Sequence, residues 1–406
     1  MGRIVYFSFP AHGHVNPTLP VIRELIRGGQ QVAYYGTEKF RLAIEGTGAL
    51  FCPYSARFAM PEQGPGPFAQ LSTTLETLLD LTRVVLDCHL EQARMLRPTH
   101  IVHDSFAPWG RFVAQLLRLP SIASVPSILI NNEIDSRYGA GRDVQPKDPR
   151  LTPQWYAAFR SRCHAGLARY SPPAFPPPQL LQSYGDLNVV YTSRLFQPMA
   201  EAFDERRFKF VGPCFGFRPE APPFPFDRLD GRPLVLVSLG TVYGNHPQFL
   251  RTCFEELAGA ACQVVLSTGG NLRSGLLGPV PENFIVRDSV PQVELLRRCA
   301  AFVTHGGMNG VQEALYYGVP MVVAPQGADQ FWISARASEL GAAVVLGGLP
   351  SGAIREGVAK ILSGTRYAAA AARIGASLRA AGGERKAAGE IWSFICPSAR
   401  GGATAA

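Results

Sequence analysis

The stretch from residue 290 to residue 330 decides the fold. Residues 290–292 read Val-Pro-Gln, residues 305–313 read His-Gly-Gly-Met-Asn-Gly-Val-Gln-Glu, and residues 327–330 read Gly-Ala-Asp-Gln. The apolar run at residues 301–304 predicts a β-strand that enters the glycine pair, and a helix is expected to begin near Asn309. A strand, a glycine turn and a helix in this order direct free backbone N–H groups and the positive end of the helix dipole into the turn. This geometry favours a bound diphosphate.

Acidic residues follow this turn at two places. Glu313 lies one turn into the expected helix, where its carboxylate can accept hydrogen bonds from ribose hydroxyls. Asp329 and Gln330 follow the next strand and can bind the hydroxyls of a sugar in the same way. The sequence therefore predicts that a nucleotide, its diphosphate and a sugar bind in order along one stretch.

The bulk composition indicates a globular protein with two domains. The chain has 406 residues, of which 47% are hydrophobic and 17% charged, and this length exceeds one ordinary core. No apolar run approaches the roughly 18–20 residues that span a bilayer, and residues 1–7 carry no signal-peptide pattern. Eight cysteines without a C-x-x-C pair predict buried thiols in a reducing compartment. We therefore expect a cytoplasmic protein.

The net charge of +8 favours anionic ligands. The excess is mostly arginine spread thinly, without the basic runs and interleaved aromatics of a nucleic-acid site, so we expect no nucleic-acid partner. Contact with an anionic membrane surface stays open, although no strongly basic amphipathic helix indicates it. The sequence does not indicate an oligomeric state.

Two halves rich in βα units predict two doubly wound Rossmann-like α/β domains. A strand at residues 3–9, a loop at 10–17, a helix and a strand at 31–35 form one βαβ unit, which requires a parallel sheet. Further strands are expected at 100–103, 121–125, 187–191 and 233–238. The predicted segments are a first domain at 1–213, a Pro-rich linker at 214–232, a second domain at 233–385, and a C-terminal helix and tail at 386–406.

Two long irregular segments, residues 55–70 and 131–155, read as loops, and long loops in a compact domain tend to be functional. In doubly wound domains ligands bind at the carboxyl ends of the strands. We therefore expect the two domains to face each other across a cleft that holds the ligands.

The loop at residues 11–17 reads Ala-His-Gly-His-Val-Asn-Pro, and Pro17 suits the first position of the following helix. A histidine just before that helix feels the positive end of its dipole, which disfavours the imidazolium and predicts a neutral ring. A neutral imidazole is what a general base requires. The alternative is that both histidines only complete hydrogen bonds of the loop. His12 and His14 could instead bind a metal ion, but no third metal ligand is evident near them.

Asp104 ends the strand expected at residues 100–103, at the same sheet edge as the histidine loop. It can orient one ring nitrogen of His14 and stabilise the imidazolium that forms when the ring takes a proton. The alternative for Asp104 is a turn or helix-cap residue. His103 is another conceivable partner for the base, but it is expected on the other face of its strand.

At these residues the chain resembles the inverting, two-domain glycosyltransferases that use UDP-sugars, and among them the bacterial macrolide-glycosyltransferase-like group. The resemblance spans nearly the whole chain, at residues 9–17, 102–104, 210–213, 237–241, 289–292, 304–313 and 325–330. It implies the GT-B fold, in which the first domain binds most of the acceptor and the second binds the nucleotide-sugar.

The resemblance also implies roles for single residues. His14 would be the catalytic base and Asp104 its partner. The implied donor contacts are the base (Ser289, Val290, Gln292), the diphosphate (Thr241, His305, Gly307, Met308, Asn309, Gly310), the ribose (Glu313) and the sugar (Asp329, Gln330).

Two positions depart from the family pattern. Many relatives have tryptophan at position 289, where it stacks on uracil. This chain has Ser289, so either the stacking on the base is weaker or Val290 and Pro291 substitute for the tryptophan. Plant relatives have serine where Gly310 stands, which removes one hydroxyl from the phosphate site. Both changes leave the choice between uridine and thymidine open.

The implied reaction moves a hexose, with glucose expected, from a UDP-sugar to a hydroxyl of a bulky apolar molecule such as a macrolide or a polyphenol. No D-x-D pair occurs, so we expect no metal and no other cofactor. The acceptor would contact aromatic residues of the long loops and of the helix expected at 75–89, namely Phe58, Phe68, Trp155, Tyr156 and Phe159. The alternative is that these rings pack beneath the loops.

Rival functions remain. A lipid or carotenoid glycosyltransferase at a membrane surface would share every motif. A UDP-sugar 2-epimerase has the same double fold, but the pairing of His14 with Asp104 suits acceptor activation better. A sugar-nucleotide-binding protein without catalysis would not need the His14 loop. A dehydrogenase or a P-loop enzyme is disfavoured, because neither G-x-G-x-x-G nor G-x-x-x-x-G-K-[ST] occurs.

Overall fold

The computed structural model describes residues 2–60, 70–138, 148–170, 180–217, 222–240, 247–269, 279–348 and 350–396. Thr241 and Phe68, predicted as contacts of the diphosphate and the acceptor, lie outside the described residues.

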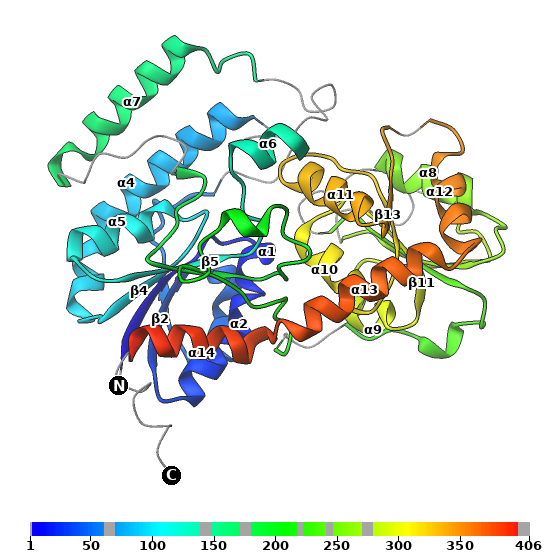
Figure 1. The fold of residues 1–406 in the computed structure, drawn as a ribbon, viewed down its shortest axis with the longest axis horizontal. Coiled ribbons are helices and arrows are strands. Elements are labelled where there is room, and N and C mark those ends of the chain that lie inside the picture. Colours follow the sequence, from blue (N-terminus) through cyan, green and yellow to red (C-terminus); the bar gives the residue numbers. More distant parts are fainter. Residues whose placement is uncertain are drawn as a thin grey trace.

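The first domain is built on a parallel sheet of seven described strands in the order β3-β2-β1-β4-β5-β6-β7. The strands are β1 (Arg3–Phe7), β2 (Gln31–Gly36), β3 (Leu50–Pro53), β4 (His100–Asp104), β5 (Ser121–Val125), β6 (Leu187–Val190) and β7 (Phe208–Phe210). Helices cover both faces of the sheet (Figure 1), so β5 and β6 are buried at every residue. The strand order reverses between β1 and β4, and a ligand crevice forms at such a switch point.

The helices of this half are α1 (His12–Val15), α2 (Thr18–Arg27), α3 (Arg41–Glu45), α4 (Leu71–Met95), α5 (Pro108–Leu117), α6 (Asn132–Tyr138) and α7 (Pro153–Leu167). The prediction of a plain loop at residues 10–17 is wrong, because the backbone N–H of His14 bonds to the carbonyl of Ala11 at 2.9 Å and closes the single turn of α1. Pro17 therefore precedes α2 and does not begin it.

The expected loop at residues 131–155 is also partly helical. The Asn131 side chain accepts a hydrogen bond from the N–H of Ile134 at 2.8 Å, and the Thr152 hydroxyl accepts one from the N–H of Trp155 at 3.1 Å. These side chains satisfy N–H groups at the starts of α6 and α7, and Pro153 follows Thr152 at the first position of α7.

The second domain has six described strands in the order β10-β9-β8-β11-β12-β13. They are β8 (Leu234–Ser238), β9 (Gln263–Ser267), β10 (Phe284–Arg287), β11 (Cys299–Thr304), β12 (Met321–Val323) and β13 (Ala343–Val345). Its helices are α8 (Pro247–Leu257), α9 (Gln292–Leu296), α10 (Met308–Tyr316), α11 (Gln330–Glu339), α12 (Ala353–Leu362) and α13 (Arg366–Ala380). Here the order reverses between β8 and β11, so the turn after β11 lies at the switch point.

The last helix, α14 (Gly383–Ile395), returns to the first domain and packs against α2 (Figure 1, red beside blue). Gly382 and Gly383, with φ of 102° and 62°, form the turn that separates it from α13. The ring of Trp392 lies so close to Gly28 that a Cβ there would come within 2.8 Å of it.

The domains also share a packed interface on the cleft side. Ile128 and Phe196 of the first half are 3% and 0% exposed and belong to the apolar core of the second half. Arg137 of α6 and Glu339 of α11 form an ion pair at 2.8 Å across the same boundary. The two sheet edges that carry the predicted site are thus held facing each other.

Candidate active site

His14 and Asp104 meet at the switch point of the first sheet, where α1 follows β1 and β4 ends. The His14 Nδ1 atom lies 3.0 Å from both carboxylate oxygens of Asp104. The Asp104 side chain is 1% exposed and that of His14 is 26% exposed. A carboxylate can only accept hydrogen bonds, so Nδ1 carries the proton and Nε2 offers its lone pair. This is the tautomer that a general base needs.

The turn after β4 fixes the carboxylate. Asp104 Oδ1 accepts a hydrogen bond from the backbone N–H of Phe106 at 2.7 Å, and the Asp104 carbonyl accepts one from the N–H of Ala107 at 2.9 Å. The carboxylate therefore holds its direction toward His14 through its own backbone.

Two opposed effects set the pKa of His14. Burial lowers this pKa, but the negative charge of Asp104, its hydrogen bond and the more distant charge of Asp329 together raise the pKa above its usual value. His14 lies inside α1 and does not lie in a loop before the helix, and its pKa shift comes from burial and from the carboxylates of Asp104 and Asp329. A neutral ring stays a prediction.

Aromatic rings flank the His14 ring. The ring centroid of Phe9 lies 4.8 Å from that of His14, and Phe106 lies 5.9 Å away. The sequence analysis missed both, although Phe9 directly precedes the histidine loop and Phe106 follows Asp104 by two residues. They present apolar surface beside the imidazole ring of His14.

The predicted acceptor residues lie deeper in the first domain. Phe58 is 6% exposed and stacks on Tyr54 at 4.2 Å, and Phe159 is 0% exposed and stacks on Trp155 at 4.9 Å. Both rings belong to the hydrophobic core, whereas Trp155 and Tyr156 are half-buried. Their contact with an acceptor stays a prediction.

The diphosphate turn of the second domain has the expected strand–turn–helix form. Gly306 adopts φ of 88°, and a Cβ at this position would lie 2.5 Å from Ser334 Oγ and 2.8 Å from Val323, so the turn requires glycine. Gly307 caps α10 without a side-chain hydrogen bond among the described residues. The first N–H groups of α10 are therefore available to an anion.

His305 lies at the start of this turn. Its ring packs against the backbone of Gly240 and Gly307, where added Cβ atoms would come within 2.8 Å and 2.5 Å of it. Burial lowers the pKa of His305 to about 4, so the ring is neutral in the unliganded protein. A neutral imidazole can still donate one hydrogen bond to a phosphate.

The predicted ribose and base contacts lie together. The Gln292 Nε2 donates to Glu313 Oε2 at 2.7 Å, and the Glu313 side chain is buried. Val290 and Met308 are buried beside them, whereas Ser289 is exposed. Gly310 leaves room for a small side chain, because a Cβ there would have ordinary contacts of 3.5 Å or more.

The predicted sugar contacts are already engaged by protein atoms. Asp329 Oδ2 accepts a hydrogen bond from the Ser127 hydroxyl of the first domain at 2.6 Å, and burial raises the pKa of Asp329. Gln330 Oε1 accepts from the backbone N–H groups of Gln326 and Gly327 at 2.7 and 3.3 Å. The sequence analysis missed Ser127, which follows β5 at the same sheet edge as Asp104.

The segment that carries His14 contacts the predicted diphosphate turn. Asn309 Nδ2 donates to the carbonyl oxygen of Gly13 at 3.2 Å. The residue before His14 is thus in contact with the first turn of α10. The structure therefore brings the two predicted halves of the site together across the domain boundary.

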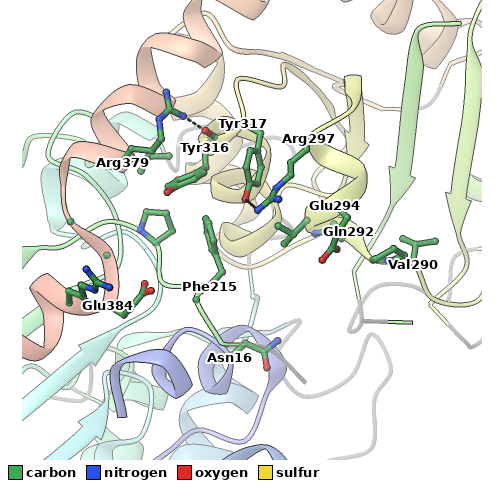
Figure 2. A pocket seen from close by; sticks show the side chains of 18 of the residues that line it. Asn16, Phe215, Val290, Gln292, Glu294, Arg297, Tyr316, Tyr317, Arg379 and Glu384 are labelled. Atoms are coloured by element: carbon green, nitrogen blue, oxygen red, sulfur yellow. Dashed lines mark hydrogen bonds between the residues drawn. The ribbon is translucent and has the colours of Figure 1, made fainter. Parts of the chain in front are cut away.

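A cavity of about 690 Å³ extends from the base-contact residues toward the linker (Figure 2). Val290 and Gln292 line one end and Glu384 lines the opposite end, with Phe215 between them, Tyr317 above and Asn16 at the lower edge of the view. This volume is that of a pocket for a small organic ligand.

The described residues contain neither a cluster of metal-binding side chains nor a membrane-spanning helix. No group of three or more His, Cys, Asp or Glu side chains in that part of the chain could hold a metal ion. None of the helices there is long and apolar enough to cross a membrane.

Comparisons with known proteins agree with this geometry. The family model for the erythromycin biosynthesis protein CIII-like C-terminal domain matches residues 251–385. The uncharacterized UDP-glucosyltransferase YojK of Bacillus subtilis is 32% identical over 97% of this chain and 98% of its own. The oleandomycin glycosyltransferase of Streptomyces antibioticus is 31% identical over 95% of this chain and 89% of its own.

Two solved structures resemble the whole chain. The glycotransferase of kitacinnamycin has a TM-score of 0.80 at 30% identity and covers 97% of this chain and 98% of its own. The calicheamicin glycosyltransferase CalG4 has a TM-score of 0.78 at 28% identity and covers 98% of this chain and 99% of its own. The two facing sheets and the shared cleft thus define a glycosyltransferase with the GT-B fold. The chain belongs to the family of bacterial UDP-glycosyltransferases and macrolide glycosyltransferases.

Proposed function

We propose that this enzyme transfers a hexose, with glucose expected, from a UDP-sugar to a hydroxyl of a bulky apolar small molecule, with inversion and with His14 as the general base. The observation that carries this proposal is the 3.0 Å contact of His14 Nδ1 with Asp104, directly opposite the turn that begins α10. The names of the relatives support the two substrates, because they include a UDP-glucosyltransferase and an oleandomycin glycosyltransferase.

In this mechanism Nε2 of His14 removes the proton from the acceptor hydroxyl while that oxygen attacks the anomeric carbon. Attack comes from the face opposite the leaving UDP, so an α-linked donor gives a β-glycoside through an oxocarbenium-like transition state. Asp104 stabilises the imidazolium that forms. The negative charge that develops on the diphosphate is stabilised by the N–H groups at the start of α10 and by a hydrogen bond from His305.

The nucleoside end of the donor is assigned to the cavity beside Gln292 and Val290. Glu313 would accept hydrogen bonds from the ribose hydroxyls after giving up part of its contact with Gln292, whose Nε2 lies 2.7 Å from Glu313 Oε2. Asp329 would likewise exchange its contact with Ser127 for hydrogen bonds from the sugar hydroxyls. Binding of the donor therefore replaces contacts that these side chains make within the protein.

The acceptor is assigned to the space above His14, where Phe9 and Phe106 supply apolar surface. An apolar molecule with one hydroxyl directed at Nε2 fits this arrangement, because its apolar surface can pack against the two rings. The proton and the diphosphate charge are handled by side chains and N–H groups, so we expect turnover without an added metal ion.

The direct experiment offers purified enzyme a panel of UDP- and TDP-sugars with macrolide and polyphenol acceptors, and detects products by mass spectrometry. A mass increase of one hexose with UDP-glucose, retained in EDTA, supports the proposal. Loss of activity in EDTA with recovery in Mg²⁺ would contradict the metal-free mechanism. Conversion of the UDP-sugar without any acceptor would indicate the epimerase instead.

A further inference from the structure

Asp104 is contacted by a second histidine, from the opposite side of β4. His103 is 0% exposed, and its Nδ1 lies 3.1 Å from the backbone carbonyl oxygen of Asp104. The mechanism above does not use this ring. A buried polar ring one residue from a proposed catalytic carboxylate therefore needs a reason of its own.

The hydrogen bond determines which nitrogen of His103 carries the proton. A carbonyl oxygen can only accept, and a neutral imidazole has a single N–H, so that N–H must be on Nδ1. Nε2 has no hydrogen-bond partner among the described residues. The other tautomer would bury this N–H without an acceptor and set two lone pairs against each other at Nδ1.

The His103 ring is neutral under working conditions. Burial lowers its pKa to about 4, although the bond to the Asp104 carbonyl opposes this. Arg111 lowers the pKa further, whereas the charges of Asp104 and Asp186 raise it. Because the His103 ring is uncharged, it can hold the backbone of Asp104 without weakening the interaction of the Asp104 carboxylate with His14.

Close packing keeps the ring in place. Gly110 in the first turns of α5 lies against β4, and a Cβ at this glycine would come within 2.4 Å of His103 Cβ and 2.9 Å of Phe7 Cβ. The helix therefore leaves the side chain of His103 little freedom. The carbonyl it contacts also accepts the N–H of Ala107 at 2.9 Å.

We propose that His103 is a positioning residue, whose Nδ1–H holds the backbone of Asp104 so that the carboxylate meets His14. The two histidines then contact the same aspartate from opposite sides, one at its carboxylate and one at its carbonyl. This proposal rests on the proposed roles of His14 and Asp104.

Three substitutions at one position separate positioning from packing. In His103→Asn the amide nitrogen can take the place of Nδ1, in His103→Gln it lies near the place of Nε2, and His103→Leu has no donor. We expect His103→Asn to keep kcat within about 3-fold of wild type, and the other two to lose about 10-fold, the effect of one hydrogen bond. The Kd of UDP should not change in any of them.

The pH profile adds a readout that packing alone would not move. A loosened Asp104 raises the pKa of His14 less, so in His103→Leu and His103→Gln the rise of kcat/KM with pH should shift to lower pH. In His103→Asn it should stay in place. Equal losses in the Asn and Leu variants, or a wild-type rate and profile in Leu, would overturn the proposal.

A measurement without turnover tests the same point. In ¹⁵N-histidine-labelled enzyme, the signals of His103 are identified as those that disappear in the spectrum of His103→Asn. They should show a protonated Nδ1 and should not titrate between about pH 5 and 9. A proton on Nε2 would refute the proposal, even if His103→Leu failed to fold. A wild-type rate for His14→Ala would instead refute the proposed function, and leave the tautomer of His103 unaffected.

Discussion

The two domains use the same local structure and place a histidine in it, yet the two histidines differ in chemistry. His14 lies in α1, the single helical turn between β1 and α2, and His305 lies in the turn between β11 and α10. The pKa of His14 is raised because Asp104 faces it, whereas burial lowers the pKa of His305 to about 4. The facing carboxylate distinguishes the ring that suits a base from the ring that suits a neutral hydrogen-bond donor.

The largest expected effect is that of His14→Ala. Loss of a general base removes about 10²–10⁴-fold of turnover on an alcohol acceptor, while the Kd of UDP measured by calorimetry should stay the same, because the donor turn belongs to the other domain. His12→Ala is the matched control. His12 lies in the same helix with its ring edge-on to Phe40 at 4.9 Å, and it should keep most of the activity. Equal losses in both variants would remove the distinction between the two histidines.

A smaller loss is expected for Asp104→Ala, about 10–100-fold in kcat. The wild-type kcat/KM should rise with pH through the pKa of His14, because the protonated ring cannot accept the proton of the acceptor. That pKa lies above the usual 6.5. Without the carboxylate the pKa of His14 falls, so the rise moves to lower pH while the maximum rate drops. A shift to higher pH would show that Asp104 does not raise the pKa of His14.

A substitution in the second domain, which is proposed to bind the donor, should change the Kd of UDP more than it changes kcat. Glu313→Gln keeps the size of the buried side chain but removes its charge, and we expect the Kd of UDP to rise about 10-fold with a smaller change in kcat. Gln292→Glu is not a useful control, since it would set two carboxylates 2.7 Å apart. Asn309→Ala also removes the contact with Gly13, so it tests the domain boundary instead. An unchanged Kd in Glu313→Gln would exclude the ribose role.

The smallest expected effect is a gain. Gly310→Ser restores the hydroxyl present in plant relatives, and the site has space for its Cβ, with the nearest atoms of Phe302 and Gln292 at 3.5 and 3.8 Å. We expect UDP to bind about 2- to 5-fold more tightly, since a hydroxyl adds one hydrogen bond at most. Gly310→Ala is the control that adds the Cβ without the hydroxyl. A gain of the same size in both variants would assign the effect to the helix and not to the phosphate.

Local sequence patterns predicted the fold well, but they predicted less well which side chains contact each other across the fold. Apolar runs and glycines were sufficient for the strand–turn–helix at Gly306, because that turn depends on residues adjacent in sequence. The meeting of His14 with Asp104 followed from the rule that strand ends share one sheet edge. The same meeting accounts for the raised pKa of His14, because the carboxylate of Asp104 stabilises the imidazolium, whereas the extent of burial that opposes it could not be predicted from the sequence.

Other features that the sequence did not show have the same origin. The short caps at Asn131 and Thr152 mark helices within a segment whose composition resembles a loop. Burial of Phe58 and Phe159 depends on the packing of distant helices, and a sequence of aromatics does not reveal which rings reach a ligand. Ser127 carries no motif, and the packing of one domain against the other brings it to Asp329.

The most direct test of the central claim is a crystal structure with an unreactive UDP-sugar and an acceptor bound together. The account predicts that Nε2 of His14 lies within hydrogen-bond reach of the acceptor hydroxyl, about 2.6–3.2 Å, with that oxygen facing the anomeric carbon and the diphosphate at the start of α10. A closed complex in which the imidazole is turned away, or another side chain contacts the hydroxyl, would contradict it.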